Sequence, residues 1–278
     1  MFGESSAPWS RTAVGWICLL SACASPPEEA RCTLTDGRAT CTHETTTLHP
    51  HNVDRDVHWQ LPLGDPPPEG FPVVLLFQGS MVPADATWSA REGAPLGAFH
   101  QVSLVAALLD GGFAVLAPEA LGWGLTCWNT NVPPWADAWE GAPDDLLMLD
   151  LFDHIEDGTF GPLDPDRLHA VGISSGGYMT SRMAVSYPGR FESLVIASAS
   201  FATCAGFACD VPDVLPADHP PTRFLHGALD PVVPMFTMER YRDALLLADV
   251  PVDTVIDDDT GHAWFSAAPV ATLAWFEG

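Results

Sequence analysis

The feature that most constrains this chain is the stretch RLHAVGISSGG at residues 167–177. Its first half is an apolar run typical of a strand. The run enters a Gly-x-Ser-x-Gly turn, after which apolar residues recur every three or four positions, as in a helix. In this context Gly172 and Gly176 leave room for a strained turn that raises the Ser174 hydroxyl above a sheet. The Ser175 N–H then starts the helix and faces a developing oxyanion. The stretch therefore predicts Ser174 as a nucleophile and Ser175 as an oxyanion donor; the alternative is a Gly- and Ser-rich turn without chemistry.

The chain of 278 residues is strongly acidic, with 36 Asp and Glu residues against 11 Lys and Arg residues and a formal net charge of -25. This charge repels a phosphate backbone, so nucleic acid is excluded as a partner. The hydrophobic fraction of 47% is ordinary for a globular core, and no internal repeat recurs at a fixed period. The length suits one large α/β domain or two small ones.

Residues 1–22 resemble an export signal. They carry one positive charge, Arg11, before an apolar run at residues 13–20 that is too short to cross a bilayer. The run ends in Leu-Ser-Ala-Cys, which resembles a bacterial lipobox and makes Cys23 the lipidated first residue of a mature chain. An ordinary small-residue cleavage site with an incidental cysteine is the alternative. We therefore expect an exported protein, either secreted or periplasmic, or anchored to a membrane through lipid at Cys23 alone.

Residues 23–52 are rich in Pro, Thr and Glu and contain few large apolar residues. This composition predicts a flexible arm ahead of a folded domain at residues 53–278. Four histidines in and beside this segment suggest a metal site, but their spacing matches no established ligand pattern, so a solvated histidine-rich arm is the favoured interpretation. These are His43, His49, His51 and His58. We expect no metal and no organic cofactor.

Cysteine usage indicates an oxidising compartment. Removal of the signal and lipidation of the cysteine that follows it leave five of the seven cysteines. Cys32 and Cys41 bracket an Asp-Gly pair typical of a hairpin turn, so a disulfide can close this segment. Cys204 and Cys209 are a second plausible bridge. Cys127 either stays outside these bridges or pairs with one of the later two cysteines, and the sequence leaves the pairing open.

From residue 57 onward, strand patterns alternate with helical ones. Residues 57–61 alternate like an edge strand, whereas later runs are continuously apolar, as in strands buried on both faces of a sheet. The acidic residues that begin the helical segment at 144–155 are interpreted as a solvated face. The predicted buried strands are residues 72–77, 113–118, 167–173, 193–198, 221–226 and 252–256, and the predicted helices are residues 104–109, 144–155, 178–187 and 238–247. This alternation predicts an α/β fold with a doubly wound, mostly parallel sheet and helices on both faces.

Two polar residues follow later strands. Asp230 lies in a His-Gly-x-x-Asp loop after one strand, and His262 lies in the loop after the last strand. Because the carboxyl ends of parallel strands meet at one edge of a sheet, we expect both beside Ser174. In this Ser, Asp, His order, His262 takes the Ser174 proton and returns it to a leaving group, while Asp230 fixes the imidazole tautomer. The alternatives are the rival acids Asp257, Asp258 and Asp259, and the histidines His169 and His226, which are interpreted as structural.

An oxyanion hole needs a second backbone donor. The apolar strand at residues 72–77 runs into Gln-Gly-Ser-Met, and we predict the Ser80 N–H as that donor, with Met81 as the second choice. A simple turn is the alternative.

A long segment at residues 119–143 carries four tryptophans, which either line a substrate pocket or cover the core. Trp128 in this segment and Trp264 after the histidine are the candidates for substrate contact.

Several local motifs carry a resemblance to one family. They are the elbow with its double glycine, Pro118-Glu119, Cys127-Trp128-Asn129, His226-Gly227-x-x-Asp230 and Gly261-His262-Ala263-Trp264. Together they resemble the poly(3-hydroxybutyrate) depolymerase and feruloyl esterase branch of the α/β-hydrolases. The resemblance spans residues 53–278 and implies the α/β-hydrolase fold. It assigns the catalytic roles to Ser174, Asp230 and His262 and the oxyanion donors to Ser80 and Ser175. In this branch His is usual where Gln78 stands, and Ala is common where Ser175 stands.

These inferences together predict an exported serine esterase that hydrolyses carboxylic esters through an acyl-enzyme. The expected substrates are small or polymeric esters, either hydroxyalkanoate oligomers or feruloyl and acetyl esters of polysaccharides. Two alternatives use the same fold: a serine peptidase, and a non-catalytic surface-anchored binding module. The complete Ser, Asp, His set argues against the binding module.

Overall fold

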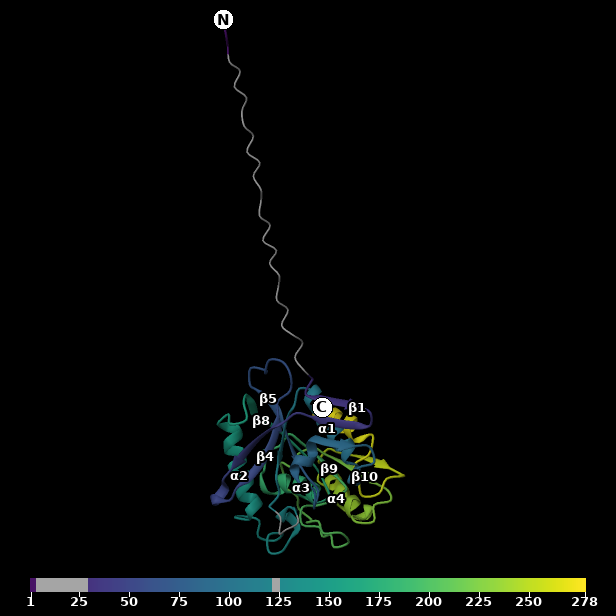
Figure 1. Ribbon diagram of the computed structural model, residues 1–278. Coiled ribbons are helices and arrows are strands. Elements are labelled where there is room, and N and C mark those ends of the chain that lie inside the picture. Colours follow the sequence, from purple (N-terminus) through teal and green to yellow (C-terminus); the bar gives the residue numbers. More distant parts are fainter. Residues whose placement is uncertain (4–29, 122–125) are drawn as a thin grey trace.

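The computed structural model describes residues 1–3, 30–121 and 126–278 (Figure 1). The predicted export signal from residue 4 onward, the lipidation site Cys23 and Trp123 of the long loop lie outside the described residues. Within the described ranges, no helix combines the length and apolar character needed to cross a membrane.

A mostly parallel sheet organises the described residues, with eight strands in the order β11-β10-β9-β8-β5-β7-β4-β3. Neighbours from β11 to β7 run parallel, whereas β4 and β3 are added antiparallel at the other end. The strands are β3 (Glu44–Leu48), β4 (Arg55–Gln60), β5 (Phe71–Phe77), β7 (Ala114–Pro118), β8 (Leu163–Ile173), β9 (Ser193–Ala197), β10 (Thr222–Gly227) and β11 (Val252–Asp257). Every residue of β5, β7 and β9 is buried, which explains their continuous apolar sequence. The predicted doubly wound sheet is confirmed.

Helices cover both faces of this sheet (Figure 1). Side chains alternate along β9, so Leu194 and Ile196 face α2, α3 and α4, whereas Val195 and Ala197 face α1 and α5. The α-helices are α1 (Ala98–Asp110), α2 (Pro143–Glu156), α3 (Ser175–Ser186), α4 (Met235–Leu247) and α5 (Ala268–Phe276), and short 3-10 turns are η1 (Pro50–Asn52), η2 (Ala84–Trp88), η3 (Pro95–Gly97) and η4 (Asn129–Asn131). The hydrophobic core therefore lies in two layers, one on each face of the sheet.

The N-terminal segment differs from the predicted flexible arm. β1 (Cys32–Thr35) and β2 (Arg38–Cys41) form a hairpin that pairs with β6 (Ser89–Arg91), and β3 is the edge strand of the main sheet. The ordered domain therefore begins by Cys32 rather than at residue 53, and β4 is an inner strand rather than an edge. Few large apolar residues suffice here because β1 buries no residue, β2 buries only Ala39 and Cys41, and β3 buries only Leu48.

Two disulfides in the described part join Cys32 to Cys41 and Cys204 to Cys209. The first closes the β1–β2 hairpin, whose Asp36-Gly37 turn has φ values of 52° and 67°. Positive φ at both central residues is typical of the tight turn that an Asp-Gly pair favours between antiparallel strands. Both expected bridges are present, so neither of the later two cysteines pairs with Cys127.

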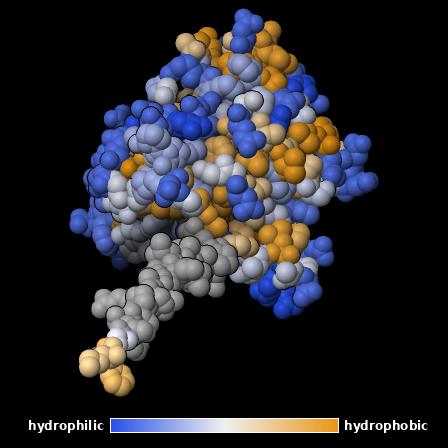
Figure 2. Space-filling view, turned by 90° about the horizontal axis from the view of Figure 1, so that it is seen from above, coloured by the Kyte–Doolittle hydropathy of each residue, from blue (hydrophilic) through white to orange (hydrophobic). Residues whose placement is uncertain are grey.

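The surface agrees with the acidic composition. Figure 2 shows hydrophilic residues over much of the face seen from above, with hydrophobic residues in separate areas between them. A formal net charge of -25 on such a surface keeps copies of the chain apart and raises solubility.

Candidate active site

Ser174 occupies a strained turn between β8 and α3, with φ 56° and ψ -120°. A Cβ atom on Gly172 would lie 2.4 Å from the Gly176 carbonyl oxygen, and one on Gly176 would lie 2.0 Å from the Phe77 oxygen. Only glycine fits at these two places, because real Cβ atoms do not approach backbone oxygens so closely. The Ser174 N–H donates to the Ala197 carbonyl at 3.0 Å, which fixes the turn against β9. The strain is therefore held by the sheet, as expected at a functional turn.

Asp230 and His262 meet at the ends of two neighbouring strands. His262 Nδ1 lies 2.7 Å from Asp230 Oδ2. The other carboxylate oxygen, Oδ1, accepts the N–H groups of Val232 at 2.8 Å and Val233 at 2.9 Å. The two loops approach closely because Gly227 at the end of β10 has no side chain. A Cβ atom there would lie 2.3 Å from the Gly261 carbonyl oxygen.

The Asp230 carboxyl group is held in its charged form. Burial alone would raise its pKa, but the hydrogen bonds from His262 and from the Val233 and Val232 N–H groups outweigh burial and lower it. An ionised carboxylate at Nδ1 selects the imidazole tautomer that carries its proton on that nitrogen. The Nε2 atom of His262 is then free to accept a proton.

One of the rival acids and both alternative histidines make contacts away from Ser174. Asp257 Oδ1 accepts the N–H of Asp259 at 3.2 Å within its own exposed turn. His226 is fully buried, its Nε2 lies 2.9 Å from the Val233 carbonyl oxygen, and burial lowers its pKa. His169 is buried inside β8, where Nδ1 lies 2.9 Å from Ser193 Oγ. These contacts support the structural interpretation of both histidines.

A pocket of about 290 Å³ brings Ser174 together with Ser80, Ser175 and Trp128. In the described part of the chain, neither the Ser80 N–H nor the Ser175 N–H is used in a hydrogen bond. The Met81 N–H, by contrast, donates to the Thr126 carbonyl at 2.7 Å and is not available. The structure therefore favours Ser80 over Met81 as the second donor.

Trp128 is fully buried in the wall of this pocket. Its backbone N–H donates to Ser175 Oγ at 3.0 Å, and its indole N–H donates to the Gln78 carbonyl at 3.0 Å. The indole also meets the Phe77 ring edge to face, at a centroid distance of 5.0 Å. Trp128 thus ties the loop after β7 to both loops that carry the predicted oxyanion donors.

No family model matches the chain. Over 250 residues, however, it is 45% identical to a poly(3-hydroxyoctanoate) depolymerase from Pseudomonas fluorescens, across 90% of this chain and 89% of that protein. The chain belongs to the poly(3-hydroxyalkanoate) depolymerase and feruloyl esterase branch of the α/β-hydrolases. A shorter match joins it to feruloyl esterase B of Thermothelomyces thermophilus, 33% identical over 98 residues, which is 35% of this chain and 32% of that one.

A solved structure agrees on the fold. A truncated carbohydrate esterase from gut microbiota superposes with a TM-score of 0.61 at 14% identity, over 91% of this chain and 98% of that chain. The predicted α/β-hydrolase fold is therefore confirmed. The identity to the depolymerase indicates that this chain is a serine hydrolase of carboxylic esters.

This α/β-hydrolase departs from its branch at Gln78, where histidine is usual. The buried Gln78 amide, oriented to satisfy both of its ends, donates to the Pro118 carbonyl at 3.0 Å and accepts the Ala120 N–H at 2.8 Å. It links the end of β5 to the end of β7 through its side chain alone. Because the predicted donor is the backbone N–H of Ser80, this difference in a side chain does not remove it.

Sequence reasoning missed a buried charged network that is centred on Arg55. Arg55 on β4 donates to the Glu119 carbonyl at 2.7 Å and pairs with Asp144 at 2.8 Å, where both side chains are buried. Asp144 also accepts the Asn129 N–H at 2.6 Å, and Glu119 accepts the Ala84 N–H at 2.6 Å. The prediction of a solvated acidic face for the start of α2 is wrong here, because Asp144 is 0% exposed. The network joins the loops that follow β5 and β7.

Trp264 does not reach the pocket of this α/β-hydrolase. It is 2% exposed and packs in the core layer beneath α1 and α5. Its indole N–H donates to Gln101 at 3.0 Å, and its backbone N–H donates to the Leu96 carbonyl at 3.0 Å. The expectation of substrate contact at Trp264 is corrected to a packing role that supports the neighbouring His262 loop.

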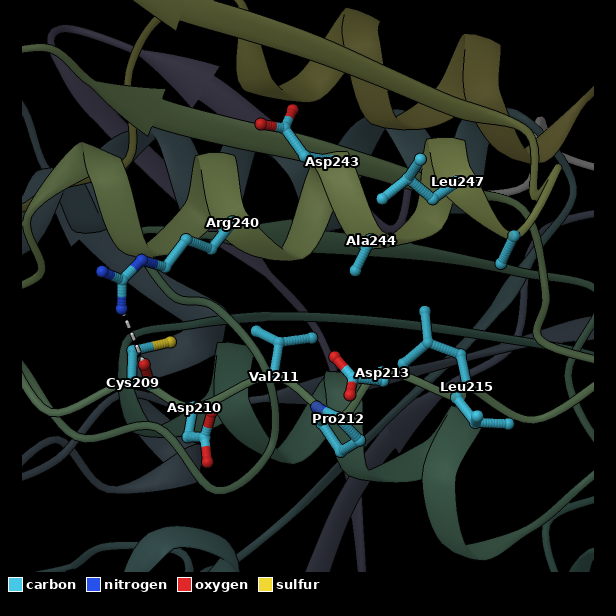
Figure 3. Close-up of a pocket in the computed structure, with 12 residues that line it drawn as sticks. Cys209, Asp210, Val211, Pro212, Asp213, Leu215, Arg240, Asp243, Ala244 and Leu247 are labelled. Carbon is cyan, nitrogen blue, oxygen red and sulfur yellow. Dashed lines mark hydrogen bonds between the residues drawn. The ribbon is translucent and has the colours of Figure 1, made fainter.

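A separate groove of about 560 Å³ lies between residues 209–215 and α4 (Figure 3). Figure 3 shows Arg240 reaching across it, and its Nη1 donates to the Cys209 carbonyl at 3.0 Å. The groove holds none of Ser174, Asp230 and His262. It is therefore distinct from the pocket beside Ser174.

Proposed function

We propose that the chain hydrolyses hydroxyalkanoate esters with Ser174 as nucleophile, His262 as general base and acid, and Asp230 as the residue that orients His262. The observation that carries the proposal is the 2.7 Å contact between His262 Nδ1 and the buried Asp230 carboxylate. That contact leaves Nε2 as the proton acceptor. The strained elbow at Ser174 and the chain order of the three residues support the same assignment.

The reaction proceeds in two halves. Ser174 Oγ attacks the acyl carbon while His262 Nε2 takes its proton, and the oxyanion receives hydrogen bonds from the Ser80 and Ser175 N–H groups. His262 then gives the proton to the leaving alkoxide, which departs as an alcohol. A water molecule repeats the attack on the acyl-enzyme, and the acid and free Ser174 are released.

No hydrogen bond joins Ser174 Oγ to His262 among the described residues. Contacts of this kind are often long until substrate is in place. The proposal therefore places the Ser174–His262 bond in the substrate complex, where the acyl carbon fixes the direction of the hydroxyl.

The chemistry of the pocket supports a neutral, apolar ester as substrate. Apolar residues form part of its wall beside Ser174, among them Trp128, Val232 and Val233. The formal net charge of -25 disfavours anionic substrates. The depolymerase homologue from Pseudomonas fluorescens is named for poly(3-hydroxyoctanoate), and this supports hydroxyalkanoates over feruloyl or acetyl esters for this chain as well.

A rate comparison tests the proposal. The substrates are p-nitrophenyl esters of increasing acyl length, 3-hydroxyoctanoate and 3-hydroxybutyrate oligomers, methyl ferulate and a p-nitroanilide. We expect turnover to be highest on the hydroxyalkanoates and to fall at least about 10⁴-fold in Ser174→Ala. Ser186→Ala, at the far end of α3, is the matched control and keeps wild-type rates.

Other outcomes would replace the proposal. Preference for methyl ferulate would move the substrate class to aromatic esters. Turnover of the anilide alone would indicate a peptidase. Equal, negligible rates in wild type and Ser174→Ala, with both proteins folded, would leave a binding module.

We also propose that residues 1–22 direct export and that Cys23 is lipidated. The Cys32–Cys41 and Cys204–Cys209 disulfides support an oxidising compartment. Mass spectrometry of the mature chain from a bacterial host checks both points. A lipid-modified N-terminal Cys23 that is lost in Cys23→Ala supports the anchor, whereas an unmodified N-terminus at another residue would replace it with ordinary cleavage.

A further inference from the structure

A cluster of metal-ligating side chains lies outside the catalytic pocket. His43 comes from the link between β2 and β3, His58 from β4, and Asp85 from η2. One ligand atom from each lies within 4.8 Å of the other two. His43 Nε2 is 3.3 Å from Asp85 Oδ1, and the two imidazole rings are 5.3 Å apart at an angle of 76°. Three chain segments therefore converge on one point.

We propose that His43, His58 and Asp85 bind a zinc ion. Two imidazole nitrogens and one carboxylate oxygen form a donor set that suits Zn²⁺, with water as the fourth ligand. Ligand atoms bound at about 2.0 Å in a tetrahedron lie about 3.3 Å apart, so atoms that are now within 4.8 Å of one another have to close by up to about 1.5 Å. Asp85 can make this adjustment because its side chain is 69% exposed, which also leaves an entry path for the ion.

Neighbouring groups orient both histidines. Thr45 Oγ1 lies 3.0 Å from His58 Nδ1 and occupies that nitrogen, which leaves Nε2 as the ligand atom. Hydrogen bonds of this kind fix the ring of a metal-binding histidine. The His43 ring stacks on Trp88 with centroids 4.9 Å apart and 20° between the planes, and Trp88 itself is 1% exposed. Both imidazoles are thus held before a metal arrives.

The backbone around the cluster is also fixed. Thr45 and His58 are paired residues of the β3–β4 ladder, and the Cys32–Cys41 disulfide closes the hairpin just before His43. On the opposite side, the Ala84 N–H beside Asp85 donates to Glu119. A bound ion would join the N-terminal strands to η2, which follows the loop that carries Ser80. Its effect would be on stability, and it takes no part in ester hydrolysis.

The sequence favours a solvated arm for all four N-terminal histidines, and for two of them the structure differs. His58 is 9% exposed, and the His43 side chain is 23% exposed. His49 remains in an exposed pair with Asp54, where Nδ1 and Oδ1 are 2.8 Å apart. Among the described residues, no third histidine, cysteine or acid lies close enough to this pair to complete a ligand set. It is therefore an internal control for the cluster.

The control is needed because 36 acidic residues can hold zinc weakly at many places. The experiment uses the full chain after treatment with EDTA and dialysis, followed by titration with ZnCl₂ in a calorimeter and metal analysis of the dialysed protein. We expect one tightly held zinc per chain in wild type and in His49→Gln. We expect its loss in the His43→Gln, His58→Gln double variant. Asp85→Asn, which changes an exposed side chain, should weaken binding at least about 10-fold.

Thermal unfolding gives a second readout. Zinc at 100 times its dissociation constant should raise the Tm of wild type by about 5 °C, and should not raise that of the double variant. The inference is overturned if wild type holds no stoichiometric zinc. It is equally overturned if Asp85→Asn and the double variant bind zinc as tightly as His49→Gln, because the ion is then held elsewhere. Neither result bears on ester hydrolysis, which depends on Ser174.

Discussion

His262 Nδ1 lies 2.7 Å from Asp230 Oδ2, and this oxygen belongs to a carboxylate whose partner oxygen is already occupied by two backbone N–H groups. His262 therefore contacts Oδ2, the carboxylate oxygen that accepts neither of these backbone hydrogen bonds. This geometry supports the role proposed for Asp230, which is to orient the imidazole.

Asp230→Asn tests this role. The amide keeps the shape of the side chain but favours the wrong imidazole tautomer, so we expect kcat on a p-nitrophenyl ester to fall about 10⁴-fold with little change in folding. Asp257→Asn is the matched control, since within the described residues its carboxylate accepts only the N–H of Asp259, and its rate should stay near wild type. A larger loss in Asp257→Asn than in Asp230→Asn would move the orienting role to the later loop.

Ser175→Ala separates the backbone of this residue from its hydroxyl group. The Ser175 hydroxyl accepts the buried Trp128 N–H at 3.0 Å, so its removal should destabilise the protein by about 1–3 kcal/mol. The predicted oxyanion donor is the backbone N–H, which alanine keeps, so kcat should change by less than about 3-fold, far below the loss for a missing oxyanion donor. Urea unfolding and ester turnover measure the two effects.

Ser103→Ala is the control for this prediction. Its hydroxyl donates to the Phe99 carbonyl one turn earlier in α1, so alanine leaves no buried backbone donor without a partner. We expect its free energy of unfolding to stay within about 0.5 kcal/mol of wild type. Equal losses in both variants would show that the Trp128 contact contributes nothing specific.

Gly227 and Gly261 should respond differently to alanine, although both lie near His262. A Cβ on Gly227 would lie 2.3 Å from backbone oxygens of Thr260 and Gly261, whereas the nearest atom to one on Gly261 is the Leu229 oxygen at 3.6 Å. Gly227→Ala should therefore displace the His262 loop, lower kcat/KM at least about 100-fold and destabilise the protein by about 2 kcal/mol. Gly261→Ala should keep activity and stability. Similar losses in both variants would contradict the steric explanation.

The sheet was predictable because inner strands such as β5 and β7 are apolar throughout, and burial on both faces demands that pattern. The N-terminal strands were not predictable. β3 has the sequence ETTTL and buries only Leu48, so its composition is that of a polar linker until β4 is beside it. The pairing of two half-buried strands is a tertiary property that local composition does not contain.

In the predicted site, too, some features follow from local sequence and others depend on tertiary contacts. The elbow and the Ser, Asp, His order follow from local motifs, but the choice between Ser80 and Met81 depends on Thr126, a residue far along the chain. Trp128 and Trp264 stand in equally distinctive motifs and are both buried in the core, yet only Trp128 also borders the pocket at Ser174. A tryptophan suits either place, and only the surrounding elements decide which it occupies.

His169 makes the folded state sensitive to acid. Burial within β8, and after it the positive charge of Arg167, lower its pKa to about 4 from 6.5. Glu192 Oε2 lies 3.3 Å from His169 Nε2, and a carboxylate at this distance favours the charged imidazole. Between those two pH values the unfolded chain binds a proton that the folded chain does not bind. The free energy of unfolding therefore falls as pH decreases through this window, and this residue has no such effect at higher pH.

His169→Gln removes this titration. At pH 7 the histidine is mostly neutral in both states, so the difference in unfolding free energy between wild type and variant there reports packing alone. As pH is lowered from 6.5 towards 4.5, wild type should lose up to about 3 kcal/mol more than the variant, and the two curves should converge or cross. Urea unfolding at half-unit pH intervals measures both curves. Parallel curves over the whole range would show that His169 is protonated as readily in the folded protein as in the unfolded chain, with Glu192 offsetting the cost of burial.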